Sequence, residues 1–184
     1  DVKMADRAGR TALHLSAQDV LVCSTGLIGI QLDTDKLYPA IASACKGLSV
    51  DGGADSAHAI MTTDSVPKLA TATSAAGWKI GGMAKGAGML APALATMLCV
   101  VMTDAVLPKD ADAIFKGAVE RTFNRIDFDG CTSTHDTILF MSSGASGVQL
   151  SEEQCTSMLL ETCSSLADQL IADAEGSTKT IEIN

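Results

Sequence analysis

The feature with the clearest chemistry is the dipeptide Ala95-Thr96, in which a small residue precedes a residue with a hydroxyl. The Thr96 hydroxyl could attack the preceding carbonyl, and water would then resolve the resulting ester into two chains. The amine of the new N-terminal residue has an ordinary pKa of roughly 7.7–8.0, so it could act as the base for its own hydroxyl. The pair is therefore compatible with a self-cleaving bond, but from the residues alone an Ala-Thr dipeptide is more often the start of a buried strand.

A glycine-rich segment with a single charge precedes this dipeptide. Lys85 has glycines on both sides, and no charged residue follows it until Asp104. An isolated lysine of this kind could bind the carboxylate of a substrate, or it could be a solvated loop residue. The uncharged segment after it admits two further interpretations, a membrane span and a dinucleotide-binding turn.

Neither of these two interpretations fits the segment well. A membrane-spanning helix needs about 20 apolar residues, whereas this stretch contains Pro92, two glycines and two threonine hydroxyls. Residues 86–91 match the G-x-G-x-x-[GA] pattern, and Asp104 lies at about the distance where this pattern has the acidic residue that binds ribose. However, the strand before that turn would be glycine-rich and cationic, and Pro92 would interrupt the helix after it.

The composition is that of a folded, acidic chain. Of 184 residues, 47% are hydrophobic and 19% are charged, and the formal net charge is −9. A negative chain with scattered basic residues repels phosphate backbones, so nucleic-acid binding is not expected. The six cysteines form no C-x-x-C pattern and no zinc-type pairing with the three histidines, which predicts reduced, structural thiols and no metal site.

Capping residues and apolar periodicity predict the helices. Asp33, Pro108 and Ser151 are residue types that start helices, and each precedes a segment with an apolar stripe. The predicted helices cover residues 3–13, 35–46, 54–61, 109–122 and 151–173.

Short apolar runs bounded by turn residues predict the strands. Residues 96–103 are continuously apolar, which predicts a strand buried on both faces. Residues 137–141 suit either a strand or the start of a helix. Because strands and helices do not alternate regularly, an α+β or layered α/β class fits better than a doubly wound sheet. The predicted strands cover residues 20–23, 66–74, 78–83, 96–103, 137–141 and 178–183.

Motifs throughout the chain occur together in one enzyme family. The glycine-rich segment 81–89, residues 95–98 around the dipeptide, and Thr103-Asp104-Ala105 are the most specific. The other matching segments are residues 22–29, 59–64, 66–68, 123–127, 132–134, 136–137 and 173–179. Together they resemble the ornithine acetyltransferase (glutamate N-acetyltransferase, ArgJ) family over nearly the whole chain.

The resemblance implies a fold and a division of the chain. The expected class is α/β (α+β), with a layered α-β-β-α sandwich that is N-terminal-nucleophile-like, of the ArgJ/DmpA type. Residues 1–184 would form a single portion of the catalytic domain. Family members cleave themselves before their threonine and both halves stay together, so residues 1–95 would belong to the α chain and residues 96–184 to the β chain.

The resemblance also implies a reaction. The family moves the acetyl group of N-acetylornithine to glutamate in arginine biosynthesis, by way of an acetylated threonine. Some members also accept acetyl-CoA as donor, so it is a possible substrate, and no cofactor is expected. The expected partners are these small molecules and a homo-oligomer, with no nucleic acid and no membrane, in the cytoplasm or, in a eukaryote, the mitochondrial matrix.

The catalytic positions of the family fall on three residues of this chain. Thr96 matches the nucleophile, and it follows Ala95 at the cleavage site. Thr25 and Gly26 match the pair that forms the oxyanion hole, where each donor contributes roughly 3–4 kcal/mol. Without the resemblance, these two residues would be interpreted as an ordinary turn.

Three residues match substrate-contacting positions of the family. Thr62 and Lys85 are two of them, and Lys85 would bind a carboxylate. Glu175 is the third, and its charge suits the cationic amine of ornithine. A Glu near a helix C-terminus opposes the helix dipole, which favours a functional role over an ordinary surface position.

The chain departs from the family pattern in two respects. His135 occupies a position where the family usually has Asn, and we expect it to be structural. The earlier part of the family's α chain and its later β-chain segments, including C-terminal residues that close over the substrate, have no counterpart in residues 1–184. Two alternatives to the acetyltransferase are therefore an inactive partial domain of the same fold and a self-processing N-terminal-nucleophile amidohydrolase.

Overall fold

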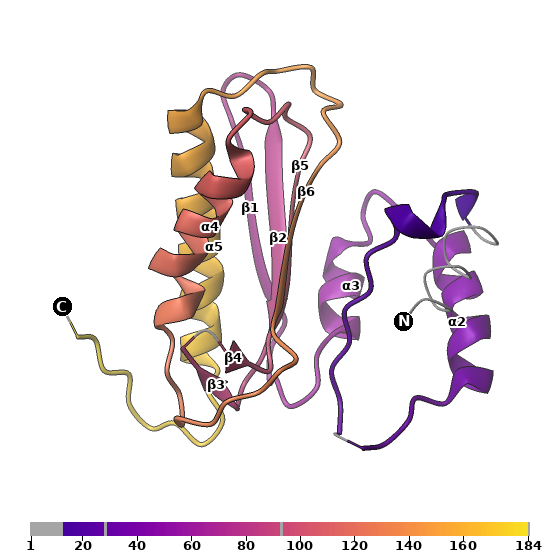
Figure 1. The fold of residues 1–184 in the computed structure, drawn as a ribbon, viewed down its shortest axis with the longest axis vertical. Helices are drawn as coiled ribbons and strands as arrows, with labels where there is room; N and C mark the ends of the chain where they lie inside the picture. The colour runs from indigo at the N-terminus through magenta and orange to yellow at the C-terminus, as the bar shows by residue number, and fades with distance from the viewer. Residues whose placement is uncertain (1–12, 28, 93, 184) are drawn as a thin grey trace. The chain divides into compact units, whose positions relative to one another are not determined.

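The computed structural model describes residues 13–27, 29–92 and 94–183. The chain divides into two compact units, Asp1–Gly53 and Ala54–Asn184, which are described separately (Figure 1). The helix predicted over residues 3–13 lies almost entirely outside the described residues.

The described part of the N-terminal unit contains a short 3-10 helix, η2 (Ala17–Asp19), and the helix α2 (Thr34–Lys46). The helix predicted over residues 35–46 is confirmed, with Asp33 as its N-cap, because the Asp33 side chain accepts hydrogen bonds from two backbone amides of the first turn. The strand predicted over residues 20–23 is wrong. These residues form no strand, and Leu21 is 61% exposed, because a short apolar run becomes a strand only where a partner strand is beside it.

The C-terminal unit contains a four-stranded sheet in the order β1-β2-β5-β6. β1 (Lys68–Thr73) pairs antiparallel with β2 (Lys79–Lys85), and β2 pairs antiparallel with β5 (Leu98–Thr103). β6 (Thr137–Ser142) then pairs parallel with β5. Four predicted strands are thus confirmed, and the segment 137–141 is a strand rather than the start of a helix.

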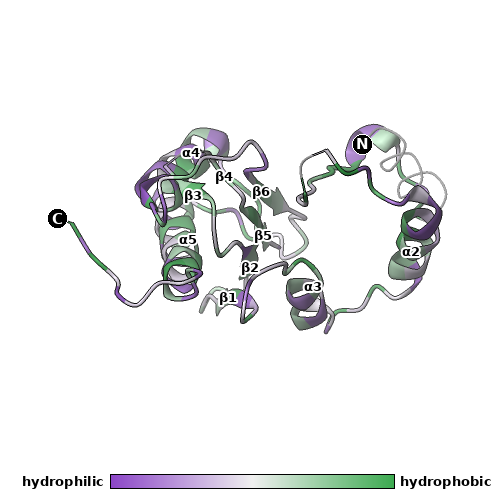
Figure 2. Ribbon diagram, turned by 90° about the horizontal axis from the view of Figure 1, so that it is seen from below, coloured by the Kyte–Doolittle hydropathy of each residue, from purple (hydrophilic) through white to green (hydrophobic). Residues whose placement is uncertain are grey.

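Helices α4 (Ala111–Arg121) and α5 (Glu152–Ala172) cover one face of this sheet, as the view along the strands shows (Figure 2). Ser151 caps α5 in a capping box with Gln154. Gly82 of β2 allows the close approach of α5, because a Cβ atom there would lie 2.9 Å from the Leu166 Cδ1 atom. Both predicted helices are therefore confirmed, as is the helix over residues 54–61, observed as α3 (Gly53–Ala59).

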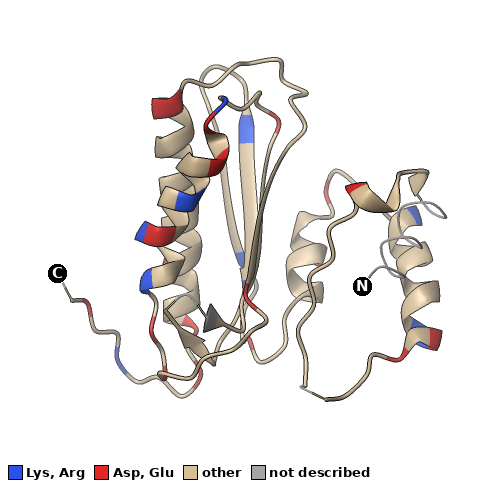
Figure 3. Cartoon of the chain, in the orientation of Figure 1, with Lys and Arg blue, Asp and Glu red and all other residues tan. Residues whose placement is uncertain are grey.

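The core between the sheet and these helices contains three of the cysteines. Cys99 of β5 and Cys155 and Cys163 of α5 are buried free thiols, and burial raises the pKa of each. Figure 3 shows that β2 carries no charge between the lysines at its two ends. The predicted role of these cysteines as structural thiols fits their place in an uncharged core.

The opposite face of the sheet is more exposed. Val101 points to the helices and is fully buried, whereas Met102 is 48% exposed and Met141 of the neighbouring strand is 39% exposed. The prediction that residues 96–103 are buried on both faces is therefore wrong for the second half of β5. The strand predicted over residues 178–183 is also wrong, because these residues lie in an exposed segment without strand pairing.

A two-stranded hairpin precedes β5 and was not predicted. β3 (Leu90–Ala91) pairs antiparallel with β4 (Leu94–Ala95), and Leu90 lies opposite Ala95. This hairpin excludes the dinucleotide-binding interpretation, because residues 86–91 lead into strand rather than into a helix. Among the described residues, no helix has both the length and the apolar character needed to cross a bilayer.

Candidate functional site

The dipeptide Ala95-Thr96 lies where the hairpin passes into the main sheet. Ala95 ends β4 and is buried, and the backbone N–H of Thr96 donates to the Met89 carbonyl oxygen at 2.9 Å. The Thr96 Oγ1 atom is buried and has no hydrogen-bond partner among the described residues. An unpaired buried hydroxyl is uncommon and costs about 1–3 kcal/mol, so it requires an explanation such as a reactive role.

The loop 86–89 lies against this dipeptide and has unusual backbone geometry. A Cβ atom on Gly86 would lie 3.3 Å from the Thr96 carbonyl oxygen, so the close approach requires glycine. Met89 has a φ of 54°, which is uncommon for a residue with a side chain. Two hydrogen bonds hold it: its N–H donates to Asp129 Oδ2 at 2.8 Å, and its carbonyl accepts the Thr96 amide. The loop and the Ala95-Thr96 dipeptide therefore fix each other's position.

Lys85 lies at the end of β2, directly before this loop, and pairs in register with Leu98. Only 1% of it is exposed, so the interpretation as a solvated loop lysine is wrong. Its Nζ atom is 3.9 Å from Asp64 Oδ2, which is too long for a hydrogen bond. Burial lowers the pKa of Lys85, and the charge of Asp64 partly offsets this effect.

A buried set of charges next to Lys85 was not predicted from the sequence. Lys68 is 0% exposed, and its Nζ atom lies 2.7 Å from Asp64 Oδ1 and 2.6 Å from Asp173 Oδ2. Asp64 Oδ1 also accepts the Gly86 N–H at 2.6 Å, and Asp64 Oδ2 accepts the Thr62 N–H at 3.1 Å. Asp64 therefore joins Lys68, the 86–89 loop and Thr62.

The pKa values of the two carboxyl groups follow from these contacts. Burial raises the pKa of Asp64, but the hydrogen bonds from Gly86 and Lys68 outweigh burial and hold that pKa below its usual value. Burial also raises the pKa of Asp173, but hydrogen bonds from Lys68 and from both the hydroxyl and the amide of Ser65 lower it to about 2. Both groups are therefore ionised at neutral pH.

Glu175 lies on the other side of the loop, in the turn that follows α5. Its backbone N–H donates to the Ala87 carbonyl oxygen at 2.6 Å, and its Oε2 atom would lie 3.4 Å from a Cβ atom on Gly88. Its exposed side chain lines a cavity of about 560 Å³. The remaining wall of this cavity comes from loop 87–88, residues 125–129 and residues 171–183.

The structure thus brings together most of the residues predicted from the sequence. Thr62 and Lys85 are connected through Asp64, while Thr96 and Glu175 are connected through loop 86–89. Thr25 and Gly26 belong to the Asp1–Gly53 unit, which is described separately from the unit that contains these four residues.

His135 is half-buried, and its backbone N–H donates to Ser133 Oγ at 3.2 Å. The next residue, Asp136, has a buried Oδ1 atom with no hydrogen-bond partner among the described residues, and burial raises the pKa of its carboxyl group. Within the described part of the chain, no group of three His, Cys, Asp or Glu residues is placed to hold a metal ion.

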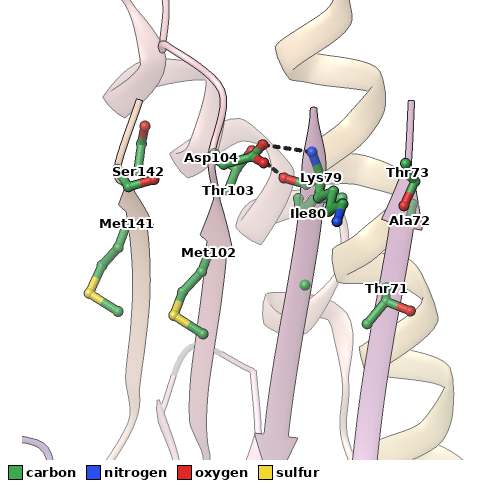
Figure 4. Close-up of a pocket in the computed structure, with 12 residues that line it drawn as sticks. Thr71, Ala72, Thr73, Lys79, Ile80, Met102, Thr103, Asp104, Met141 and Ser142 are labelled. Carbon is green, nitrogen blue, oxygen red and sulfur yellow. Dashed lines mark hydrogen bonds between the residues drawn. The ribbon is translucent and has the colours of Figure 1, made fainter. Parts of the chain in front are cut away.

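A second cavity, of about 600 Å³, lies at the opposite end of the sheet from Lys85 (Figure 4). Its polar groups bond to one another: the Thr103 hydroxyl donates to the Lys79 carbonyl oxygen at 2.7 Å, and Asp104 accepts the Lys79 N–H at 2.6 Å. The side chains of Met102 and Met141 lie next to each other on its apolar wall. Among the described residues, no hydroxyl that lines this cavity is both buried and unpaired, so we place the candidate site at the Lys85 end.

Fold and site together define a mixed α/β protein in which a buried lysine and an unpaired threonine hydroxyl flank a glycine-rich loop. The chain belongs to the ArgJ family, whose model matches residues 1–184. It is 53% identical over 173 residues to the arginine biosynthesis bifunctional protein ArgJ of Thermobifida fusca, covering 94% of this chain and 45% of the relative.

Two further relatives with the same name match the chain to a similar extent. The arginine biosynthesis bifunctional protein ArgJ of Streptomyces avermitilis is 50% identical over 180 residues, covering 97% of this chain and 46% of the relative. The protein of the same name from Mycobacterium leprae is 49% identical over 170 residues, covering 91% of this chain and 42% of the relative. The chain therefore spans less than half the length of the relatives it matches.

Proposed function

We propose that this chain is the part of an acetyltransferase that carries the nucleophile, and that the enzyme moves an acetyl group from N-acetylornithine to glutamate. The relatives at about 50% identity are named as arginine biosynthesis proteins, which supports this pathway. The observation that carries the proposal is the buried, unpaired Thr96 hydroxyl beside a glycine-rich loop and a buried lysine.

Self-cleavage would prepare the nucleophile. The Thr96 hydroxyl attacks the Ala95 carbonyl carbon, the C–N bond between the two residues breaks, and the Thr96 nitrogen takes up the proton. Water then hydrolyses the resulting ester, which frees the Ala95 carboxylate and restores the hydroxyl. The free amine of Thr96 can thereafter act as the base for that hydroxyl.

The two halves would remain associated after cleavage. β2 precedes the bond and β5 follows it, and the two strands pair along their length from Ile80–Thr103 to Lys85–Leu98. Cutting one peptide bond removes none of these ladder hydrogen bonds. We infer that the complete enzyme has the layered α-β-β-α architecture of N-terminal nucleophile proteins, assembles as a homo-oligomer and works in the cytoplasm or, in a eukaryote, in the mitochondrial matrix.

Transfer would then proceed in two half-reactions. The Thr96 hydroxyl attacks the acetyl carbonyl of N-acetylornithine, Thr25 and Gly26 stabilise the oxyanion, and ornithine leaves as the amine. The amine of glutamate next attacks the acetyl ester and restores Thr96. Acetyl-CoA is a second possible donor for the first half-reaction, and no cofactor takes part.

The charges around Thr96 suit these substrates. Lys85 is a buried cation without a hydrogen-bonded carboxylate, so it can bind the carboxylate of either amino acid, with Thr62 beside it. Glu175 presents a carboxylate to the 560 Å³ cavity, where it can bind the ammonium group of ornithine.

An inactive partial domain and an amidohydrolase are the two alternatives. The test uses the product of the complete gene, whose intact mass should show two fragments that meet at Ala95 and Thr96. With acetyl-labelled N-acetylornithine and glutamate, the label should appear in N-acetylglutamate. One uncut chain without transfer would support the inactive domain, and label released only as acetate would support the amidohydrolase.

A further inference from the structure

Asp64 contacts three parts of the candidate site, namely Thr62, Lys85 and the loop that begins at Gly86. Its Oδ2 atom accepts the Thr62 N–H at 3.1 Å and faces the Lys85 Nζ atom at 3.9 Å. Its Oδ1 atom accepts the Gly86 N–H at 2.6 Å, and Gly86 in turn packs against the Thr96 carbonyl. The Asp64 side chain has no exposed surface, so water cannot replace any of these contacts.

The way in which Asp64 holds Lys85 is unusual for a buried ion pair. At 3.9 Å the two groups attract each other, but no proton of the ammonium group is committed to Asp64. The hydrogen-bonding capacity of Asp64 is instead occupied by Thr62, Gly86 and Lys68. Asp64 therefore holds Lys85 in place and partly offsets the lowering of its pKa by burial, while the N–H donors of Lys85 remain available to an anionic ligand.

Lys68 and Asp173 support Asp64 from the side away from the loop. Lys68 Nζ lies between the two carboxylates, at 2.7 Å from Asp64 and 2.6 Å from Asp173. Asp173 accepts the Ser65 N–H at 2.9 Å, so it is anchored to the segment next to Asp64. The charges that face Lys85 are thus Asp64, which raises its pKa, and Lys68, which lowers it.

We propose that Asp64 is a positioning residue of the substrate site, which orients Lys85 and the Gly86 loop so that the Lys85 ammonium group can bind the substrate carboxylate. The substrate in this proposal, glutamate, rests on the proposed function, whereas the geometry around Asp64 does not depend on it. Asp64 does not touch substrate. It acts through Lys85 and through the backbone of the loop.

Asp173 provides a matched control for Asp64. Each carboxylate accepts a hydrogen bond from Lys68 and one from a nearby backbone amide, so Asp64→Asn and Asp173→Asn both remove a partner of Lys68. Only Asp64 reaches Lys85 and Gly86. A purely structural role would give the two variants the same phenotype.

The test makes both substitutions in the product of the complete gene. We expect Asp64→Asn to raise KM for glutamate by about tenfold, in the range of a charge-assisted hydrogen bond, with a smaller effect on kcat. Asp64→Glu should restore part of the affinity, and Asp173→Asn should leave KM within about twofold. Equal changes of KM in Asp64→Asn and Asp173→Asn would overturn the proposal.

A second measurement does not depend on activity. The ¹³Cε chemical shift of Lys85, assigned by its loss in Lys85→Arg, is titrated with pH. Removing the negative charge of Asp64 should lower the pKa of Lys85, because that charge favours the ammonium form, whereas Asp173→Asn should leave the titration unchanged. If wild-type protein transfers no acetyl group, the proposed function fails, and this titration still decides the role of Asp64.

A third variant covers the case in which Asp64→Asn does not fold. The double variant Lys68→Met/Asp173→Asn removes both members of the outer ion pair and leaves Asp64 facing Lys85 alone. The pKa of Lys85 should then rise, because the repulsive charge of Lys68 is gone while Asp64 remains. An unchanged or lowered pKa of Lys85 in this variant would contradict the proposal.

Discussion

The two ends of strand β2 each carry a lysine, and these two ends differ in how their polar groups are used. At the first end, Lys79 is exposed, and its backbone bonds to Asp104 and to the Thr103 hydroxyl. At the other end, Lys85 is buried and, among the residues that the structure describes, neither its ammonium group nor the Thr96 hydroxyl has a hydrogen-bond partner. At the Lys79 end these polar groups thus bond to one another, whereas the Lys85 end leaves donors for a ligand.

This difference cannot be explained by composition, because both ends contain a lysine, an aspartate and a threonine. It arises from what covers each end. Residues 86–92 and 94–95 form a loop and hairpin over the Lys85 end that exclude water, whereas the Lys79 end opens onto an exposed face. Exclusion of water raises the free-energy cost of an unpaired polar group. It also strengthens the electrostatic interaction of that group with a bound ligand.

The largest expected effect comes from removing the Thr96 hydroxyl, and removal of the Thr103 hydroxyl at the other end provides the comparison. We expect Thr96→Ala to abolish self-cleavage and to lower acetyl transfer by about 10³-fold or more, because the proposed acetyl ester forms on this hydroxyl. Thr96→Ser should keep part of both activities. Thr103→Val, which removes the satisfied hydroxyl at the other end, should leave cleavage unchanged, as measured by intact mass and by transfer of labelled acetyl groups.

An active Thr96→Ala variant would contradict the assignment of the nucleophile. Loss of cleavage in Thr103→Val without a loss of thermal stability would show that the two ends are not functionally distinct, and the comparison between them would fail.

A smaller effect is expected from the two lysines. Lys85→Met should raise KM for glutamate by about 10- to 100-fold, because it removes the cation that we propose binds the substrate carboxylate. Stability should change little, since Asp64 keeps Lys68 as its ion-pair partner at 2.7 Å. Lys79→Met should leave KM unchanged, and equal changes of KM in the two variants would refute a specific role for Lys85.

Features set by neighbouring residues could be predicted from the sequence more often than features set by distant ones. Helices α2 and α5 were predicted because their start signals, Asp33 and Ser151, act on amides within three residues. The strand over residues 20–23 was predicted wrongly, because an apolar run does not indicate whether a partner strand is present. Local signals were therefore reliable, whereas features that depend on distant segments were not.

The site follows the same rule. Lys85 and Thr96 were found from their residue types and from the family motifs, but the burial of Lys85 was not evident in a segment of glycines. The ion pair between Lys68 and Asp173 joins residues 105 positions apart, so no pattern in either segment points to the other. Asp64 was visible only as part of a family motif, and its central position became apparent from its contacts.

The smallest expected effect concerns stability in acid. The pKa of Asp173 is about 2 in the folded protein, against an ordinary value of 3.8, because of Lys68 and Ser65. A carboxyl group with a depressed pKa stabilises the folded state above its unfolded pKa, and this contribution is lost as the pH falls through the folded value. It amounts to about 2 kcal/mol and disappears between roughly pH 4 and pH 2.

Urea unfolding at a series of pH values measures this contribution. Wild-type protein should lose stability steeply between pH 4 and pH 2, and Asp173→Asn should be less stable at neutral pH but show a shallower loss over that range. Asp104→Asn removes the carboxylate at the other end of β2, where Asp104 bonds to a backbone amide rather than to a buried cation. It should leave the acid-dependent loss of the wild type intact. If Asp104→Asn flattens the pH dependence as much as Asp173→Asn does, the buried charges near Lys85 are not the source of the acid sensitivity.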